Sequence, residues 1–189
     1  MDSRPAPFWN LPNALTILRI VAIPVLIVLM SFPGRLASFL AALAFLTAGM
    51  TDLLDGFLAR RQRLVTRAGK FMDPLADKLL VSAALIMLIP LGRVEAWLVF
   101  VIIGREIAVT GLRAIAAAEG QVIAADRWGK LKTILQMSAL FALILHYPYA
   151  GLAFQQIGTV LLYIAAVITV ASGFSYYFTF FHPTSSTPA

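Results

Sequence analysis

The chain has 189 residues, of which 60% are hydrophobic and only 13% are charged. Soluble domains are typically about half apolar and about a quarter charged, so this composition excludes a soluble globular protein and predicts an integral membrane protein. The absence of cysteine and the presence of only two histidines exclude disulfides, a thiol nucleophile and a thiolate or histidine-rich zinc site. The net charge of +6 does not by itself indicate a nucleic-acid partner, because basic residues of membrane proteins usually report topology and contact with anionic lipids.

Six apolar stretches follow one another along the chain, and most are close to the length of about 20 residues that a membrane-spanning helix needs. They cover residues 13–31, 36–58, 72–91, 95–117, 129–147 and 152–180. The predicted fold is therefore an all-α integral membrane protein with six transmembrane helices. We expect residues 1–12 to form a short N-terminal interfacial segment, residues 13–181 the six-span domain, and residues 182–189 a disordered C-terminal tail.

Basic residues gather on one side of these predicted spans. The connection after the second span is rich in arginine, and a second basic region surrounds the connection 118–128, whereas the opposite side offers only Arg35 and Arg93. The positive-inside rule then places both of these basic connections and both termini in the cytoplasm. We therefore predict a multi-pass protein of the cell (inner) membrane whose active site faces the cytoplasm.

The second and third spans carry four of the nine acidic residues: Asp52, Asp55, Asp73 and Asp77. The first two are spaced i, i+3 and the last two i, i+4, so each pair shares a helix face. A short connection makes the two helices antiparallel neighbours, on which four carboxylates can converge. Oxygen ligands without histidine or cysteine suit Mg²⁺, Mn²⁺ or Ca²⁺. An ion-pair network with the nearby arginines, or a helix N-cap at Asp73, is the alternative that spacing alone leaves open.

Small residues accompany the acidic faces. Gly56 lies one turn after Asp52 and Gly69 one turn before Asp73, where a missing side chain lets a helix or a ligand approach closely. Ala59 continues the small face, and Arg60 can reach a phosphate with its planar guanidinium. Helix packing alone is the alternative role of both glycines.

The fourth and fifth spans contain basic residues that are costly inside a membrane unless they are paired. Arg105 lies in the middle of the fourth span. Arg113, Lys130 and Lys132 lie nearer the cytoplasmic face, and Thr133 and Gln136 can add hydrogen bonds. Together with Arg105 they can bind the phosphate of an anionic acceptor. The alternatives are an ion pair of Arg105 with Glu106 or Asp73, and interfacial positions for the two lysines.

The acidic motif resembles the signature of a known family. The stretch Asp52-Leu53-Leu54-Asp55-Gly56-Phe57-Leu58-Ala59-Arg60, followed by Gly69, Asp73 and Asp77, fills every fixed position of D-x-x-D-G-x-x-A-R, eight residues, G-x-x-x-D-x-x-x-D, the signature of the CDP-alcohol phosphatidyltransferases. The segment Pro12–Thr16 with Arg19 is similar to that family's N-terminal segment. The regions around Arg105-Glu106 and 129–133 are similar to its bacterial phosphatidylglycerophosphate synthases. The last 50 or so residues carry no specific likeness.

The resemblance implies a six-helix fold, a homodimer and two divalent metal ions, Mg²⁺ or Mn²⁺. It implies metal ligation by Asp52, Asp55, Asp73 and Asp77, with Asp77 also the general base. The expected CDP-lipid site consists of Asn13, Thr16, Gly56, Ala59, Arg60 and Gly69. The expected acceptor-phosphate site consists of Arg105, Arg113, Lys130, Lys132 and Thr133.

The implied reaction transfers the phosphatidyl group from CDP-diacylglycerol to sn-glycerol 3-phosphate, giving phosphatidylglycerophosphate and CMP in contact with membrane lipids. The same chemistry with inositol phosphate, serine or phosphatidylglycerol as acceptor is the nearest alternative. A divalent-cation transporter and a non-catalytic lipid-binding scaffold are alternatives of other classes. No second acidic cluster lies on the opposite side for a transport path, and the complete signature disfavours a scaffold.

Overall fold

The computed structural model describes residues 11–62, 67–119 and 127–181, and these residues are helical apart from short connections. The helices are α1 (Leu11–Ser31), α2 (Arg35–Gln62), α3 (Arg67–Leu88), α4 (Ala96–Ala118), α5 (Arg127–Leu145) and α6 (Phe154–Phe181). Each helix coincides with one of the six predicted apolar stretches, so the prediction of an all-α fold is confirmed. The segments 1–10 and 182–189, predicted as an interfacial segment and a tail, lie outside the described residues.

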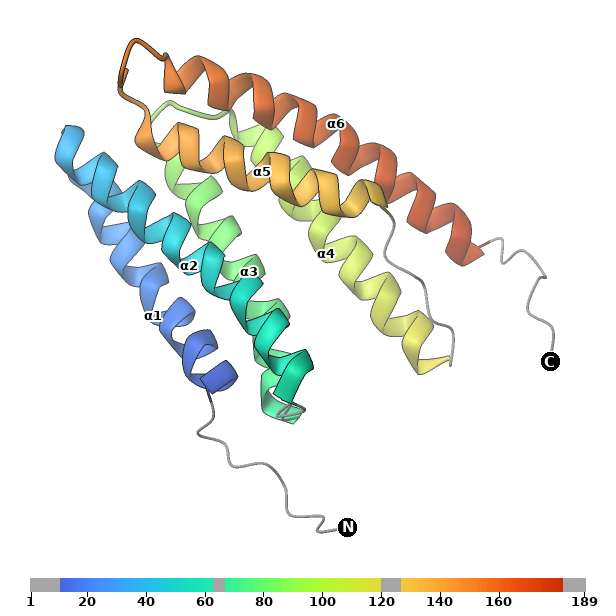
Figure 1. The fold of residues 1–189 in the computed structure, drawn as a ribbon. Helices are drawn as coiled ribbons and strands as arrows, with labels where there is room; N and C mark the ends of the chain where they lie inside the picture. Colours follow the sequence, from blue (N-terminus) through green and yellow to red (C-terminus); the bar gives the residue numbers. More distant parts are fainter. Residues whose placement is uncertain (1–10, 63–66, 120–126, 182–189) are drawn as a thin grey trace.

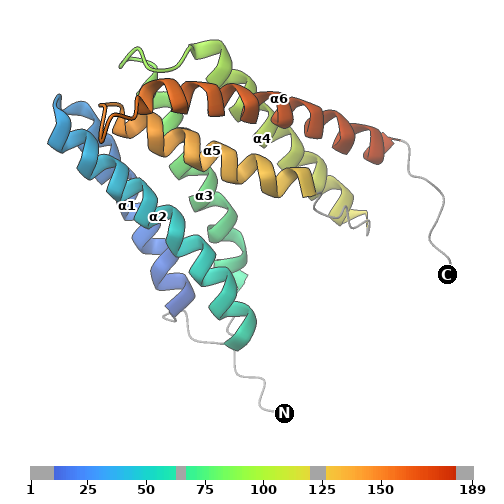
Figure 2. The same ribbon diagram turned by 45° about the horizontal axis from the view of Figure 1, so that its top comes forward.

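The helices form two groups of three that meet along α2, α3 and α5. Helix α1 packs against α2 and α3, while α6 packs against α4 and α5. Figures 1 and 2 show that the groups lie close together where α2 passes α5 and diverge toward the opposite ends of the helices. The start of α1, the end of α2 and the start of α3 lie together at one end of the first group (Figure 1). The motif-bearing ends of these helices are therefore neighbours.

A continuous apolar core joins the two groups. Phe45 of α2, Leu80 and Leu85 of α3, and Leu140 and Leu143 of α5 are completely or almost completely buried in it. Many large apolar side chains instead face outward, as expected of helices that are solvated by lipid.

Two of the described helical segments are long and apolar enough to cross a membrane by length and composition alone. They are Asn13–Ser31 in α1 and Phe154–Phe178 in α6. Shorter apolar segments occupy 35–50 of α2 and 131–145 of α5. Together with the outward-facing apolar side chains, these segments are typical of a membrane protein, while the number of spans stays a prediction.

The connections at the end of the molecule away from the motif are fixed by side chains that cap a helix. Arg93 Nη1 donates hydrogen bonds to the carbonyl oxygens of Leu143 (3.1 Å) and Ile144 (3.0 Å), in the last turn of α5. Gln155 Nε2 donates to the carbonyl of Arg93 (3.2 Å), and its Oε1 lies 3.0 Å from Nδ1 of His146. A cation near the carboxyl end of a helix is favourable, so this end is a structural clasp between α3, α5 and α6.

Helices α5 and α6 approach closely at Gly158. A Cβ atom at this position would lie 2.7 Å from Leu143 Cγ, 2.9 Å from its backbone nitrogen and 3.0 Å from the carbonyl oxygen of Ala139. Small residues allow such close approach of membrane helices. Gly158 thereby sets the distance between α5 and α6.

We predict that Gly158→Ala lowers the stability of the folded protein by about 1–3 kcal/mol, because the added methyl group overpacks the contact with the α5 backbone. The measurement is thermal unfolding in detergent micelles. Gly111→Ala is the matched control, since no atom lies within 4 Å of a Cβ built at Gly111. Equal midpoints for both variants would contradict the close packing of α5 and α6.

Candidate functional site

The two acidic pairs of the motif lie on adjacent helices. Asp52 and Asp55 belong to α2, and Asp73 and Asp77 belong to α3. The two helices contact each other and run in opposite directions (Figure 1). This arrangement is the antiparallel pair that the sequence predicts. The side chains of residues 51–71 lie outside the described residues, and with them those of Asp52, Asp55, Gly56, Ala59, Arg60 and Gly69.

The donor chemistry of this region fits a hard divalent cation. Asp73 and Asp77 lie one turn apart on α3, and the chain has no cysteine that would favour a softer metal. Within the part of the chain whose side chains are described, no group of three or more acidic, histidine or cysteine side chains is placed to bind a metal. The side chains of the two α2 aspartates lie outside that part of the chain, so metal ligation by all four stays a prediction.

Polar residues at the start of α1 are buried against α2 and α3. Asn13, Thr16 and Arg19 are 2%, 0% and 1% exposed. The hydroxyl of Thr16 donates a hydrogen bond to Oδ1 of Asp73, and Nε of Arg19 donates to the carbonyl of Ala48 at 3.1 Å. Helix α1 therefore supports the acidic region directly, through a bond that fixes the orientation of one motif carboxylate.

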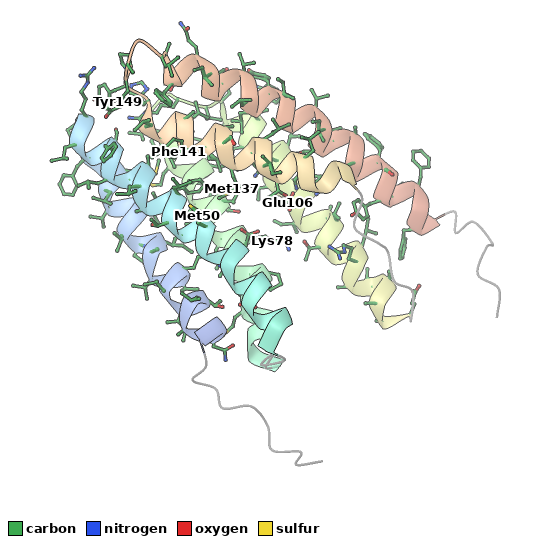
Figure 3. All side chains as sticks on the ribbon, viewed as in Figure 1. Met50, Lys78, Glu106, Met137, Phe141 and Tyr149 are labelled. Carbon is green, nitrogen blue, oxygen red and sulfur yellow. The ribbon has the colours of Figure 1, made fainter. Side chains whose placement is uncertain are left out.

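A small polar cavity of about 40 Å³ lies between α3, α4 and α5. Its polar lining comes from three helices and comprises Asp77, Lys78, Ser82, Glu106, Lys132, Thr133 and Gln136. Figure 3 shows Glu106, Lys78 and Met137 close together between the two groups of helices. The cavity thus unites Asp77 with Lys132 and Thr133, which the sequence assigned to different parts of one site.

Glu106 is the shared ion-pair partner of two cations beside this cavity. Its Oε1 accepts hydrogen bonds from Nη1 of Arg105 at 3.0 Å and from Nζ of Lys132. Lys132 is only 5% exposed, and a buried ammonium group needs such a counter-charge. The expected alternative for Arg105, an ion pair with Glu106, is therefore present in the structure.

Arg105 is also bound by α6. Its Nε donates to the carbonyl of Thr169 at 3.1 Å, its Nη2 donates to Oγ of Ser172 at 2.7 Å, and its guanidinium lies 5.7 Å from the ring centroid of Tyr176. Each of its three nitrogens is thus a donor to the protein. Arg105 does not line the polar cavity; it lines an apolar hollow of about 320 Å³ between α4 and α6.

Two further acceptor-site candidates, Arg113 and Thr133, are exposed. Arg113 is exposed on α4, about two turns after Arg105. It does not line the cavity. Thr133 is exposed, and its hydroxyl donates to the carbonyl of Gly129 at 3.0 Å. Lys130 belongs to α5, and its side chain lies outside the described residues.

The sequence did single out Gln136, but it gave no role to the polar face of α6 or to the cavity residues Lys78 and Ser82. A signal for the former was present. Residues 169, 172, 173 and 176 are Thr, Ser, Gly and Tyr, spaced as one helix face within an otherwise apolar segment. A polar stripe at this spacing inside a membrane helix indicates a buried polar partner, here Arg105.

Comparisons with known proteins agree with the motif. Residues 9–171 match the family model described as CDP-alcohol phosphatidyltransferase. Three similar relatives are named CDP-diacylglycerol–glycerol-3-phosphate 3-phosphatidyltransferase: that of Bacillus subtilis (45% identical, 89% of this chain, 94% of the relative), that of Rickettsia typhi (45%, 89%, 95%) and that of Haemophilus influenzae (39%, 89%, 91%).

We predict that Thr16→Val destabilises the folded protein by about 1.5–3 kcal/mol, the range for hydrogen bonds to charged groups, because Asp73 loses a buried donor. Thr16→Ser is the matched control, since it keeps the hydroxyl and removes only a methyl group. Thermal unfolding of both variants in detergent measures the difference. A Val variant as stable as the Ser variant would exclude a supporting role for the Thr16–Asp73 bond.

Proposed function

The chain belongs to the CDP-alcohol phosphatidyltransferase family, and we propose that it transfers the phosphatidyl group from CDP-diacylglycerol to sn-glycerol 3-phosphate, giving phosphatidylglycerophosphate and CMP. Its relatives that carry this enzyme name match over 89% of the chain. Among features of the structure, the observation that carries the proposal is the cavity in which Asp77, a proton acceptor, and Lys132, an anion-binding cation, line the same space.

In this proposal the protein crosses the cell (inner) membrane six times, with both termini and the site on the cytoplasmic side. The support is the basic connection after α2 and the position of the acidic motif at the adjoining ends of α2 and α3. A phosphorylated, water-soluble acceptor then reaches the site from the cytoplasm, while the diacylglycerol chains of the donor stay in the bilayer. We include a homodimer in the proposal, supported by the family resemblance alone.

The metal site proposed here consists of Asp52, Asp55, Asp73 and Asp77 and takes two Mg²⁺ or Mn²⁺ ions. Its support is the complete motif on two contacting helices and the all-oxygen donor set. Divalent ions bound there would screen the charge of the lipid diphosphate and polarise its phosphoryl oxygens. The hydroxyl of Thr16 holds the Asp73 carboxylate in one orientation for this role.

The donor site proposed here surrounds the metal ligands. Asn13 and Thr16 are contributed by the start of α1, and Gly56, Ala59, Arg60 and Gly69 by the facing ends of α2 and α3. The small residues leave room for the cytidine diphosphate, and Arg60 binds a phosphate through its guanidinium. Thr16 is buried and donates to Asp73, so in this proposal Thr16 acts on the donor through the Asp73 carboxylate.

The acceptor hydroxyl attacks the phosphorus that is linked to diacylglycerol. A new P–O bond forms to the acceptor, the P–O bond to the CMP phosphate breaks, and CMP leaves with the bonding electron pair. Asp77 takes the proton of the attacking hydroxyl. For this step the bound acceptor must place that hydroxyl within hydrogen-bond reach of the Asp77 carboxylate. Lys132 and Thr133 line the same cavity and bind the phosphate of the acceptor. Arg113 and Arg105 of α4 and Lys130 of α5 complete this proposed acceptor site.

We expect the detergent-purified protein to release CMP from CDP-diacylglycerol only when glycerol 3-phosphate is present with Mg²⁺ or Mn²⁺. Inositol phosphate, serine, phosphatidylglycerol and no acceptor are compared in parallel, and excess EDTA should abolish release because the carboxylates would lose their metals. Release with a different acceptor would discard the acceptor assignment. Absence of CMP release with every acceptor, from protein shown to be folded, would discard the transferase proposal in favour of transport or a scaffold.

We expect Asp77→Asn to lower kcat by at least about 100-fold, within the usual range for loss of a general base, while CDP-diacylglycerol still binds. Turnover is measured by CMP release, and donor binding by the shift of the thermal unfolding midpoint on adding CDP-diacylglycerol. Glu119→Gln, an exposed carboxylate at the end of α4, is the matched control and should retain full turnover. Normal turnover of Asp77→Asn would remove the general-base role.

A further inference from the structure

A chain of hydrogen bonds links α6 to the polar cavity without any of its α6 members lining that cavity. Ser172 Oγ accepts from Arg105 Nη2 (2.7 Å), Arg105 Nη1 donates to Glu106 Oε1 (3.0 Å), and the same Oε1 accepts from Lys132 Nζ. Glu106 and Lys132 line the cavity with Asp77, whereas Arg105 and Ser172 do not. The chain therefore runs from α6 through α4 to α5.

The α6 end of this chain is rigidly built. Ser172 is 4% exposed, and its own hydroxyl donates to the carbonyl of Thr169 at 3.1 Å. That carbonyl also accepts from Arg105 Nε. Gly173 lies against the stem of Arg105, since a Cβ there would be 3.1 Å from Arg105 Cγ. The guanidinium is consequently held on two sides, by hydrogen bonds and by packing.

Lys132 is the last member of this chain of hydrogen bonds, at the cavity. Lys132 is 5% exposed, and one of its three ammonium donors is used by Glu106. Two adjacent residues on a helix point about 100° apart, so Glu106 faces the cavity while Arg105 faces α6. This divergence lets α4 transmit the position of α6 to the lysine on α5.

We propose that Ser172 and Glu106 are positioning residues for the acceptor: α6 fixes Arg105, Arg105 fixes Glu106, and Glu106 holds the Lys132 ammonium where the acceptor phosphate binds. The inference rests on the proposed function, which places that phosphate at Lys132. It assigns a role to the polar face of α6, which lies outside the signature motif. The affinity for the acceptor is then set partly by a helix that does not touch it.

The test is steady-state kinetics of Ser172→Ala with glycerol 3-phosphate and CDP-diacylglycerol varied separately. We expect the KM for glycerol 3-phosphate to rise about three- to tenfold, within the range of coupling through packed networks. The KM for CDP-diacylglycerol and kcat should stay within about twofold of wild type. Thr159→Val is the matched control, because its hydroxyl donates to the carbonyl of Gln155 at the other end of α6. It should change none of these constants.

Two further variants separate a positioning role from a general loss of structure. Gly173→Ala pushes on the Arg105 stem without removing a hydrogen bond, and it should also raise the KM for glycerol 3-phosphate. In a Glu106→Gln background, where the relay is already broken, Ser172→Ala should add little to the increase. The relay would be overturned if Ser172→Ala and Glu106→Gln together raised the KM for glycerol 3-phosphate by the product of their separate increases. Equal increases in the KM values of both substrates would also overturn it.

Lys132→Ala distinguishes failure of this inference from failure of the proposed function. If Lys132→Ala raises the KM for glycerol 3-phosphate but neither Ser172→Ala nor Gly173→Ala does, the relay is wrong and the acceptor site stands. If Lys132→Ala leaves that KM unchanged, the placement of the acceptor phosphate at Lys132 is wrong, and the inference falls with it. Thermal unfolding in detergent is recorded for every variant so that kinetic changes are compared among folded proteins only.

Discussion

Charged side chains inside an apolar helical bundle must be paired within the bundle, because neither packed side chains nor lipid can solvate them. This constraint organises the molecule around Glu106, whose single oxygen accepts from Arg105 and Lys132 and so joins α4 to α5. Thr16 meets the same requirement for Asp73, and the carbonyl of Ala48 meets it for Arg19. Each polar contact also fixes one helix against another, so satisfying the charges and assembling the site are one process.

The two groups of helices contribute different parts of the proposed chemistry. Helices α1, α2 and α3 carry the acidic motif and the residue that supports it, while α4, α5 and α6 carry the basic cluster. The groups meet through the apolar core along α2, α3 and α5. Asp77 and Lys132 line one cavity because this contact brings α3 next to α5. A donor bound by the first group and an acceptor bound by the second would therefore meet at Asp77.

The predictions from sequence succeeded where a pattern repeats locally and remained open where distant segments had to meet. Six apolar stretches predicted the six described helices. The main difference from the predicted bounds is that α2 continues past its apolar stretch to Gln62, and α3 begins before its apolar stretch, at Arg67. For Arg105 the sequence left phosphate binding and an ion pair with Glu106 as alternatives. The structure contains the ion pair and adds Ser172, 67 residues away along the chain. No local spacing relates these two residues, although the polar stripe of α6 was visible.

The sequence by itself determined the helical content, the membrane character, the family and the acidic motif, because hydrophobicity, helical periodicity and motif spacing are properties of consecutive residues. It also placed Asp73 and Asp77 on one face of one helix. Only the tertiary structure decided which buried cation pairs with which carboxylate, that Thr16 supports Asp73, and that α6 reaches the cavity through Arg105 and Glu106. Those choices depend on which helices pack together, and packing is governed by the fit of whole surfaces rather than by spacing along one chain segment.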